Sequence, residues 1–343
     1  MLKRPILLQL LLAAVLVGCS KPSITKKTVP DSTSTAVTEA LDESASRDKK
    51  NGESRIAYGE KGVVVSGHPI ATRAGLEVLK KGGNAVDAAV AVGLTLGVVD
   101  SHNSGIGGGC FILIRRSDGS FHAIDGREMA PAAATRDMYI RNGKADPELS
   151  QTGALASGVP GALAAYDSAV RRFGKTKLAD HLNAAAKIAE EGFPVNASFA
   201  AVNRSTAKEL AKFEESRRIF LKDGKPLETG DILKQPDLAN TYRSIAREGI
   251  GWFYGGPFAK ATEDWMKKNG GIMTVEDFKN YAPVDREPIF SSYRGYTVAT
   301  FPPPSSGGVH LIQILNMAET KDLRAMNNRA DAIHFVAEAM KLA

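Results

Sequence analysis

An apolar segment followed by a run of glycines limits the possible folds of this chain more than any other feature. Residues 85–99 read AVDAAVAVGLTLGVV and are apolar on every side of a helical projection, which is typical of a helix inside a protein. The length of this segment and the charge of Asp87 argue against a membrane span. Residues 104–114, SGIGGGCFILI, then place four glycines ahead of an apolar run that is typical of a strand. The expected order is buried helix, glycine turn, strand.

This order excludes one reading of the glycines. Their spacing superficially matches the G-x-G-x-x-G fingerprint, in which a main chain approaches a pyrophosphate at the start of a helix. The fingerprint needs the order strand, glycines, helix, which is not the order here. Asp118-Gly119 instead predicts a hairpin turn with a second strand behind it. We therefore expect no nucleotide cofactor.

The bulk composition is that of a globular protein. The chain has 343 residues, of which 43% are hydrophobic and 24% charged, so one or two domains with a substantial core are expected. A net charge of +6, spread along the chain and not interleaved with aromatic residues, gives no reason to expect nucleic acid as a partner. The histidines show no metal-binding spacing and are expected in the core or on the surface: His68, His102, His122, His181, His310 and His334.

The first 19 residues predict export. Lys3 and Arg4 precede an apolar segment that is too short to span a membrane. Residues 16–19, LVGC, resemble a bacterial lipobox, in which Cys19 is acylated and becomes the mature N-terminus; an ordinary cleaved signal is the alternative. The lipid would anchor the protein at the periplasmic face of a membrane, and Ser20 does not mark retention at the inner one. Residues 20–55 are rich in Ser, Thr and charge and predict a flexible tether.

Cys110 is the second of two cysteines. If Cys19 carries lipid, no intrachain disulfide can form. We interpret Cys110 as a small buried hydrophobe. A catalytic thiol is the alternative, but no histidine or positive charge stands next to it in the sequence to lower its pKa.

Periodicity and capping residues predict a largely helical remainder. Residues 61–69 predict a short strand into a loop, and a helix follows Pro69. Asn84 is expected to cap the next helix, with Asp87 three positions on. Beyond the hairpin we expect a helix opening at Pro160, helices over 178–192, 196–214, 236–248 and 257–268, a strand pair over 288–301, a helix from Val309, and a final amphipathic helix over 330–343.

Several strings between Gly62 and Ala343 carry a family resemblance when taken together and in order: VVSGHPIATRAGLEVLKKGGNAVDAAVA, SGIGGGCFILI, DGREMAPAAA, SGVPGALAAY, PPPSSGGVHLIQILN and HFVAEAMKLA. This combination resembles the large subunit of γ-glutamyltransferases, also called glutathione hydrolases. The resemblance implies an α/β (α+β) fold for residues 56–343: the large-subunit portion of an N-terminal-nucleophile hydrolase, a four-layer αββα sandwich whose precursor cleaves itself into two subunits. Gly107 to Gly109 would then supply unusual φ values and close packing at the turn into a core strand.

The resemblance also implies a reaction. A threonine at the new N-terminus of a small subunit attacks the γ-glutamyl carbonyl of glutathione or a related compound, and its own α-amine acts as the base. Water or an amino acid or peptide acceptor then releases the γ-glutamyl group. No metal or organic cofactor is implied.

Arg127, in DGRE at residues 125–128, matches the arginine that binds the α-carboxylate of the γ-glutamyl group. A guanidinium can pair with a carboxylate through two parallel hydrogen bonds. The alternative is that Arg127 only neutralises Asp125 or Glu128. The segment from Ser305 to Gly308 could supply hydroxyl and amide donors to a site, although a strand-to-helix turn explains it equally well.

Two further features bear on whether this chain contains a catalytic nucleophile. Ser157 lacks the G-x-S-x-G context of a nucleophile elbow and is expected to be a loop and helix-entry residue. No Thr-Thr or Thr-His pair occurs in the chain, so the family's nucleophile motif is missing and no catalytic residue is assigned.

We consider three explanations for the missing motif: an incomplete or split-gene sequence, a large subunit encoded apart from its partner, and a non-catalytic lipid-anchored γ-glutamyl-binding or interaction protein. A related acylase acting on a glutaryl side chain also stays open, because the fold serves both chemistries.

Overall fold

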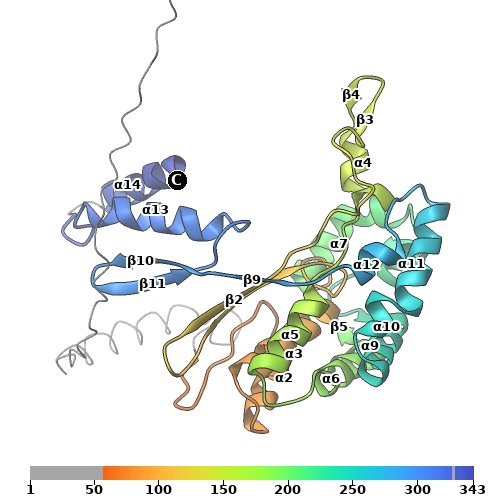
Figure 1. The fold of residues 1–343 in the computed structure, drawn as a ribbon, viewed down its shortest axis with the longest axis horizontal. Coiled ribbons are helices and arrows are strands. Elements are labelled where there is room, and N and C mark those ends of the chain that lie inside the picture. Colours follow the sequence, from red (N-terminus) through yellow and green to blue (C-terminus); the bar gives the residue numbers. More distant parts are fainter. Residues whose placement is uncertain (1–56, 327–328) are drawn as a thin grey trace, which may run out of the picture. The chain divides into compact units, whose positions relative to one another are not determined.

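The computed structural model describes residues 57–326 and 329–343. The predicted signal sequence, the lipidation at Cys19 and the tether over residues 20–55 lie outside the described residues. The chain divides into residues 1–60 and residues 61–343. Every helix and strand given below belongs to the second unit, and Figure 1 shows their arrangement.

Two N-terminal helices pack against each other. Helix α2 (Pro69–Lys80) begins where the His68 ring accepts a hydrogen bond from the backbone of Ile70. Helix α3 (Ala85–Val99) begins with a capping box between Asn84 and Asp87, as predicted. Most of α3 is buried, which confirms the expectation of an interior helix.

The short strand predicted at the start of residues 61–69 is wrong. This segment is extended without strand pairing, and Val63 and Val65 are exposed. A β-branched run forms a strand only where a neighbouring strand accepts its backbone hydrogen bonds. None pairs with it among the described residues.

The glycine turn leads into an antiparallel hairpin. Strand β1 (Cys110–Arg115) pairs with β2 (Phe121–Gly126), so that Cys110 lies opposite Gly126. Gly119 takes the positive φ of 85° that the predicted turn needs. A third strand, β9 (Val284–Arg286), lies beside β2 with Asp125 opposite Val284 (Figure 1). The strand order is β1-β2-β9, so β1 is an edge strand within the described part of the chain.

Helices cover this sheet and continue beyond it. Helix α5 (Ala162–Phe173) contacts both hairpin strands and begins two residues after Pro160, with Gly161 as its N-cap. The single helix predicted over residues 196–214 is two helices, because Phe213 takes an extended backbone between them. They are α7 (Ala197–Leu210) and α8 (Glu214–Phe220). The predictions for α6 (Leu178–Glu191), α9 (Pro236–Glu248) and α11 (Pro257–Lys268) are confirmed.

Short elements complete the central part. Three short helices are α4 (Pro147–Gln151), α10 (Gly251–Tyr254) and α12 (Val275–Lys279); α10, α11 and α12 lie side by side in Figure 1. Two-residue strands form the pairs β3 (Ile140–Arg141) with β4 (Lys144–Ala145), β5 (Phe193–Pro194) with β8 (Ile232–Leu233), and β6 (Leu221–Lys222) with β7 (Lys225–Pro226).

The C-terminal elements follow the predicted order. Strands β10 (Ile289–Tyr293) and β11 (Tyr296–Thr300) form a hairpin, followed by α13 (Gly307–Glu319) and α14 (Arg329–Leu342). Ring contacts join this part to the first hairpin, with centroids 5.4 Å apart for Phe121 and Phe290. Within residues 57–326 and 329–343, no helix combines the length and apolarity needed to cross a bilayer.

Candidate substrate-binding site

Arg127 directly follows β2, and both of its backbone polar groups are held. Its N–H donates to Oδ1 of Asp125 over 2.9 Å. Its carbonyl oxygen accepts a hydrogen bond of 2.8 Å from the Tyr281 hydroxyl. The strand end therefore fixes where the Arg127 side chain starts.

Asp125 has a different cationic partner. Its side chain is 5% exposed, and its Oδ2 accepts hydrogen bonds from Nε and Nη2 of Arg286 over 3.0 and 2.8 Å. Arg286 lies on β9 and reaches Asp125 because β9 pairs with β2. Arg286, not Arg127, therefore pairs with the Asp125 carboxylate. The alternative that Arg127 neutralises Asp125 is wrong, whereas Glu128 does lie near the Arg127 guanidinium.

The Arg127 guanidinium itself is weakly engaged. The side chain is 64% exposed, and its Nε lies 3.7 Å from Oε2 of Glu128, a separation at which exposed ion pairs contribute little. Its Cζ lies 6.0 Å from the centre of the Phe111 ring, within cation–π range. Because the strand end is held and the guanidinium is not saturated, Arg127 can accept a carboxylate ligand with little rearrangement of the backbone.

Glu128 borders a cavity of about 450 Å³ beside the glycine turn. The cavity is lined by that turn, by the end of α3 and by Leu238 and Tyr242 of α9. A Cβ at Gly109 would lie 2.6 Å from Oε2 of Glu128 and 2.7 Å from the Gly126 carbonyl oxygen. Glycine is therefore required here for close approach, as predicted. The expected unusual φ values at Gly107 to Gly109 are wrong: in this turn the positive φ belongs to Gly105.

Cys110 lies half-buried at the start of β1. Burial raises the pKa of its thiol to about 12, and the carboxylates of Glu128 and Asp125 add to this rise. A neutral thiol is a poor nucleophile. These observations favour the interpretation of Cys110 as a packing residue over a catalytic one.

We expect Cys110 in the folded protein to resist alkylation by iodoacetamide at pH 8 and to react readily in urea. The reason is that only about one thiol in ten thousand is ionised four pH units below the pKa. Mass spectrometry of Cys110 peptides at timed intervals measures the rate. Alkylation of the folded protein as fast as of the unfolded protein would contradict this view.

A buried Asp–Thr–His cluster lies apart from Arg127. The Thr176 hydroxyl donates to Oδ1 of Asp87 over 2.8 Å and lies 2.8 Å from Nε2 of His181. Asp87 is fully buried and also accepts the backbone N–H groups of Asn84, Lys175 and Thr176. In a nucleophilic triad the histidine stands between the carboxylate and the hydroxyl. Here the hydroxyl stands in the middle, so the cluster ties α3 to the loop before α6.

Hydrogen bonding also sets the charge state of this cluster. Burial alone would raise the pKa of Asp87, but the hydrogen bonds from Asn84, Lys175 and Thr176 bring it below its ordinary value. Burial lowers the pKa of His181, although Asp87 opposes this. The cluster therefore holds a carboxylate and a neutral imidazole at neutral pH.

The remaining sequence candidates lie elsewhere. Ser305 and Ser306 lie in the turn between β11 and α13, where Ser306 is the N-cap residue and its carbonyl accepts from His310; the structure shows the predicted turn and leaves a catalytic role untested. Ser157 follows a single 3₁₀ turn, Ala154–Ala156. Among the described residues, no three His, Cys, Asp or Glu side chains gather closely enough to hold a metal ion.

Arg286 and Tyr281 were not predicted as part of the site. They lie more than 150 residues after Asp125 and Arg127 in the chain. The pairing of β2 with β9 brings Arg286 to Asp125, and Tyr281 lies just before β9. The three residues of β9 carry no strand pattern strong enough to predict that pairing. No local sequence signal could have found them.

The described residues define a mixed α/β protein that presents an exposed arginine at the end of a sheet strand. The model of the Gamma-glutamyltranspeptidase family matches residues 71–343, and the chain belongs to this family. That result confirms the resemblance drawn from the sequence.

Individual relatives agree with this assignment. The glutathione hydrolase proenzyme of Escherichia coli (strain K12) is 45% identical over 287 residues, which cover 83% of this chain and 50% of that protein. The Acylase ACY 1 proenzyme of Pseudomonas sp. (strain V22) is 41% identical over 300 residues, or 85% of this chain and 54% of that protein. The chain thus spans about half the length of these relatives.

A solved structure is similar as well. The crystal structure of Helicobacter pylori gamma-glutamyltranspeptidase superposes with a TM-score of 0.80 at 41% identity and covers 83% of each chain. The mixed α/β fold is therefore that of known gamma-glutamyltranspeptidases.

Proposed function

We propose that this chain is the large-subunit part of a γ-glutamyltransferase or glutathione hydrolase, and that Arg127 binds the α-carboxylate of the γ-glutamyl donor. One observation carries the assignment of the site. Arg127 is fixed through both backbone polar groups, while its exposed guanidinium has only a 3.7 Å contact with Glu128 as an ion pair. Family membership supplies the γ-glutamyl chemistry.

In the proposed reaction, Arg127 orients the donor and the bond-breaking group comes from a small subunit. The hydroxyl oxygen of an N-terminal threonine attacks the γ-carbonyl carbon while the α-amine of that threonine takes the hydroxyl proton. The amide nitrogen leaves with a proton, and a γ-glutamyl ester remains on the threonine. Water or an amino acid or peptide then accepts the γ-glutamyl group. The proposal needs no metal or organic cofactor.

The free edge of the sheet supports a partner subunit. Strand β1 has one neighbour among the described strands, and a cavity of about 880 Å³ lies between β1, α3 and the end of α5. An unpaired edge beside an apolar hollow favours pairing with a further strand. A partner strand here would extend the sheet toward the four-layer αββα sandwich that the family resemblance implies.

The proposed location rests on residues 1–19. Acylation of Cys19 would hold the protein at the periplasmic face of a bacterial membrane, with the outer membrane favoured by Ser20. Incorporation of labelled palmitate that is lost in Cys19→Ser tests this part of the proposal.

An acylase is the second candidate function. The relatives named as acylases favour it, and a glutaryl group carries the same carboxylate as a γ-glutamyl group without the α-amine. Recognition through Arg127 is compatible with both substrates.

The enzyme assembled from this chain and the rest of its proenzyme separates the candidates. We expect faster release of p-nitroaniline from γ-glutamyl-p-nitroanilide than from glutaryl-p-nitroanilide. Faster turnover of the glutaryl compound would establish the acylase instead. If neither compound is cleaved but γ-glutamyl compounds bind, the chain belongs to a binding protein.

A further inference from the structure

We infer that Tyr281 is a positioning residue that holds Arg127 in place for the donor carboxylate. This inference rests on the proposed function of Arg127. Tyr281 reaches the site through its hydroxyl, which donates to the Arg127 carbonyl oxygen over 2.8 Å. It acts on the backbone of Arg127 and not on the ligand.

The hydrogen bond from Tyr281 is one of two that hold the Arg127 backbone at the end of β2. The Arg127 N–H is held by Asp125, which is itself held by Arg286 from β9. Tyr281 holds the other side of the same residue. With both backbone groups bonded, the peptide planes on either side of Arg127 cannot rotate freely. The backbone from which the Arg127 side chain extends is therefore held in position.

The Tyr281 ring is supported in turn. It stacks on Tyr254 with centroids 5.8 Å apart and an interplanar angle of 14°. The Tyr254 hydroxyl donates to the Pro160 carbonyl and accepts from the Ala164 N–H at the start of α5. A Cβ at Gly161 would collide with the Tyr281 hydroxyl. The absence of a side chain at Gly161 therefore leaves room for this hydroxyl.

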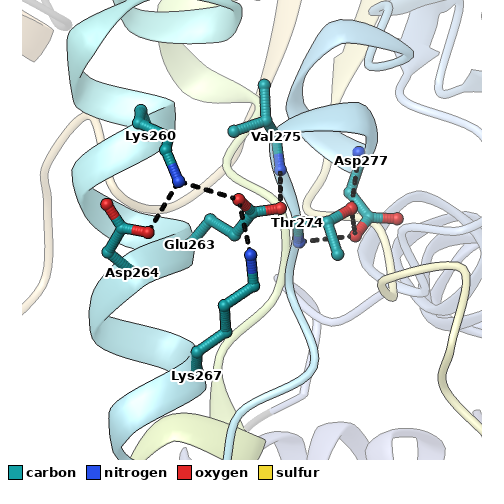
Figure 2. A network of polar contacts seen from close by, with 7 residues as sticks. All are labelled: Lys260, Glu263, Asp264, Lys267, Thr274, Val275 and Asp277. Atoms are coloured by element: carbon teal, nitrogen blue, oxygen red, sulfur yellow. Dashed lines mark hydrogen bonds and ion pairs between the residues drawn. The ribbon is translucent and has the colours of Figure 1, made fainter.

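The segment before Tyr281 is also tied to the loop that carries Arg127. Oδ1 of Asp277 accepts the Ala132 N–H over 2.8 Å, while its Oδ2 accepts from Thr274 in a capping box. Figure 2 shows this cap together with Glu263 of α11. Glu263 accepts the Val275 N–H and pairs with Lys267 over 2.9 Å. Residues 274–281 thus hold the loop over 127–132 at two points and are themselves anchored to α11.

Burial raises the pKa of the Tyr281 phenol, with the Asp125 charge adding to this rise. The hydroxyl therefore stays protonated at neutral pH and remains a donor. A protonated hydroxyl is what the hydrogen bond to the Arg127 carbonyl oxygen requires.

We expect Tyr281→Phe in the assembled enzyme to raise KM for γ-glutamyl-p-nitroanilide about 3- to 10-fold and to change kcat less than about 2-fold. The substitution keeps the ring stack and removes one hydrogen bond, which matches a change of this size. The inhibition constant of L-glutamate should rise by the same factor. Tyr139→Phe is the matched control, because its hydroxyl also donates to a backbone carbonyl, that of Leu155, over 3.0 Å; it should change neither constant.

A double-mutant cycle with Arg127→Ala decides how Tyr281 acts. If Tyr281 works through Arg127, Tyr281→Phe has no further effect once the guanidinium is gone. Equal effects of Tyr281→Phe with and without Arg127 would overturn the inference, as would a silent Tyr281→Phe beside a damaging Arg127→Ala; both leave the proposed function standing. A silent Arg127→Ala would refute the proposed function itself and this inference with it.

Discussion

Arg127→Ala is expected to lower kcat/KM for γ-glutamyl donors about 30- to 1,000-fold in the assembled enzyme, mainly through KM. Two parallel charge-assisted hydrogen bonds to a carboxylate are worth about 2 to 4 kcal/mol, which corresponds to this range. The loss falls on donor binding because Arg127 contacts neither the scissile carbonyl nor the nucleophile in the proposed reaction. Initial rates over a series of γ-glutamyl-p-nitroanilide concentrations measure it.

Two companion variants show whether the geometry or only the charge matters. Arg127→Lys keeps the charge but cannot form the planar pair, so it should recover only part of the loss. Arg116→Ala removes a half-exposed arginine that pairs with Asp118 in the hairpin turn, 3.5 Å away, and should leave the kinetics unchanged. Equal losses in Arg127→Ala and Arg116→Ala would show a general charge effect and contradict the assignment.

Asp87→Ala is expected to lower the free energy of unfolding by about 3 to 4 kcal/mol and the melting temperature by about 6 to 12 °C. The substitution leaves the buried N–H groups of Asn84, Lys175 and Thr176 without their carboxylate acceptor, and each such group costs about 1 to 3 kcal/mol. Part of this loss is recovered when the loop relaxes and water enters. Thermal unfolding of the assembled protein followed by circular dichroism measures the shift.

The same group makes stability depend on pH. Because the folded state lowers the pKa of Asp87 below its ordinary 3.8, its charge stabilises the fold fully above that value, and the contribution is lost as pH falls through the lowered pKa. The difference in melting temperature between wild type and Asp87→Ala should therefore shrink in acid. Asp264→Ala, which removes an exposed helix partner of Lys260, should change stability by less than about 0.5 kcal/mol. An Asp87→Ala melting temperature close to that of Asp264→Ala would show that the buried cluster is dispensable.

Local signals in the sequence were sufficient for much of the fold. The capping box at Asn84 and Asp87, the Asp118-Gly119 turn and the apolar pattern of residues 85–99 each depend on neighbours within a few positions, and each prediction is confirmed. The strand prediction at the start of residues 61–69 was wrong because a strand does not depend on near neighbours alone. A strand needs a partner, and a short apolar run cannot reveal that none will pair with it.

The candidate site was likewise predicted only in part from local sequence. Arg127 was predicted as a binding residue because its DGRE context resembles a family motif, and the structure adds that both of its backbone polar groups are hydrogen-bonded. The residues that hold this strand end, Tyr281 and Arg286, lie more than 150 residues further along the chain, on or just before the neighbouring strand β9, and carry no local signature. The competing view that Arg127 neutralises Asp125 could only be decided once Arg286 was seen to occupy that carboxylate.

The most direct test of the account compares two donors that differ only in the α-carboxylate. 4-Aminobutyryl-p-nitroanilide keeps the amine and chain of γ-glutamyl-p-nitroanilide but lacks the carboxylate. Wild-type enzyme should prefer the γ-glutamyl donor by about 30-fold or more in kcat/KM, and Arg127→Ala should bring that preference close to one. An undiminished preference in Arg127→Ala would show that the carboxylate is recognised elsewhere and would contradict the central claim.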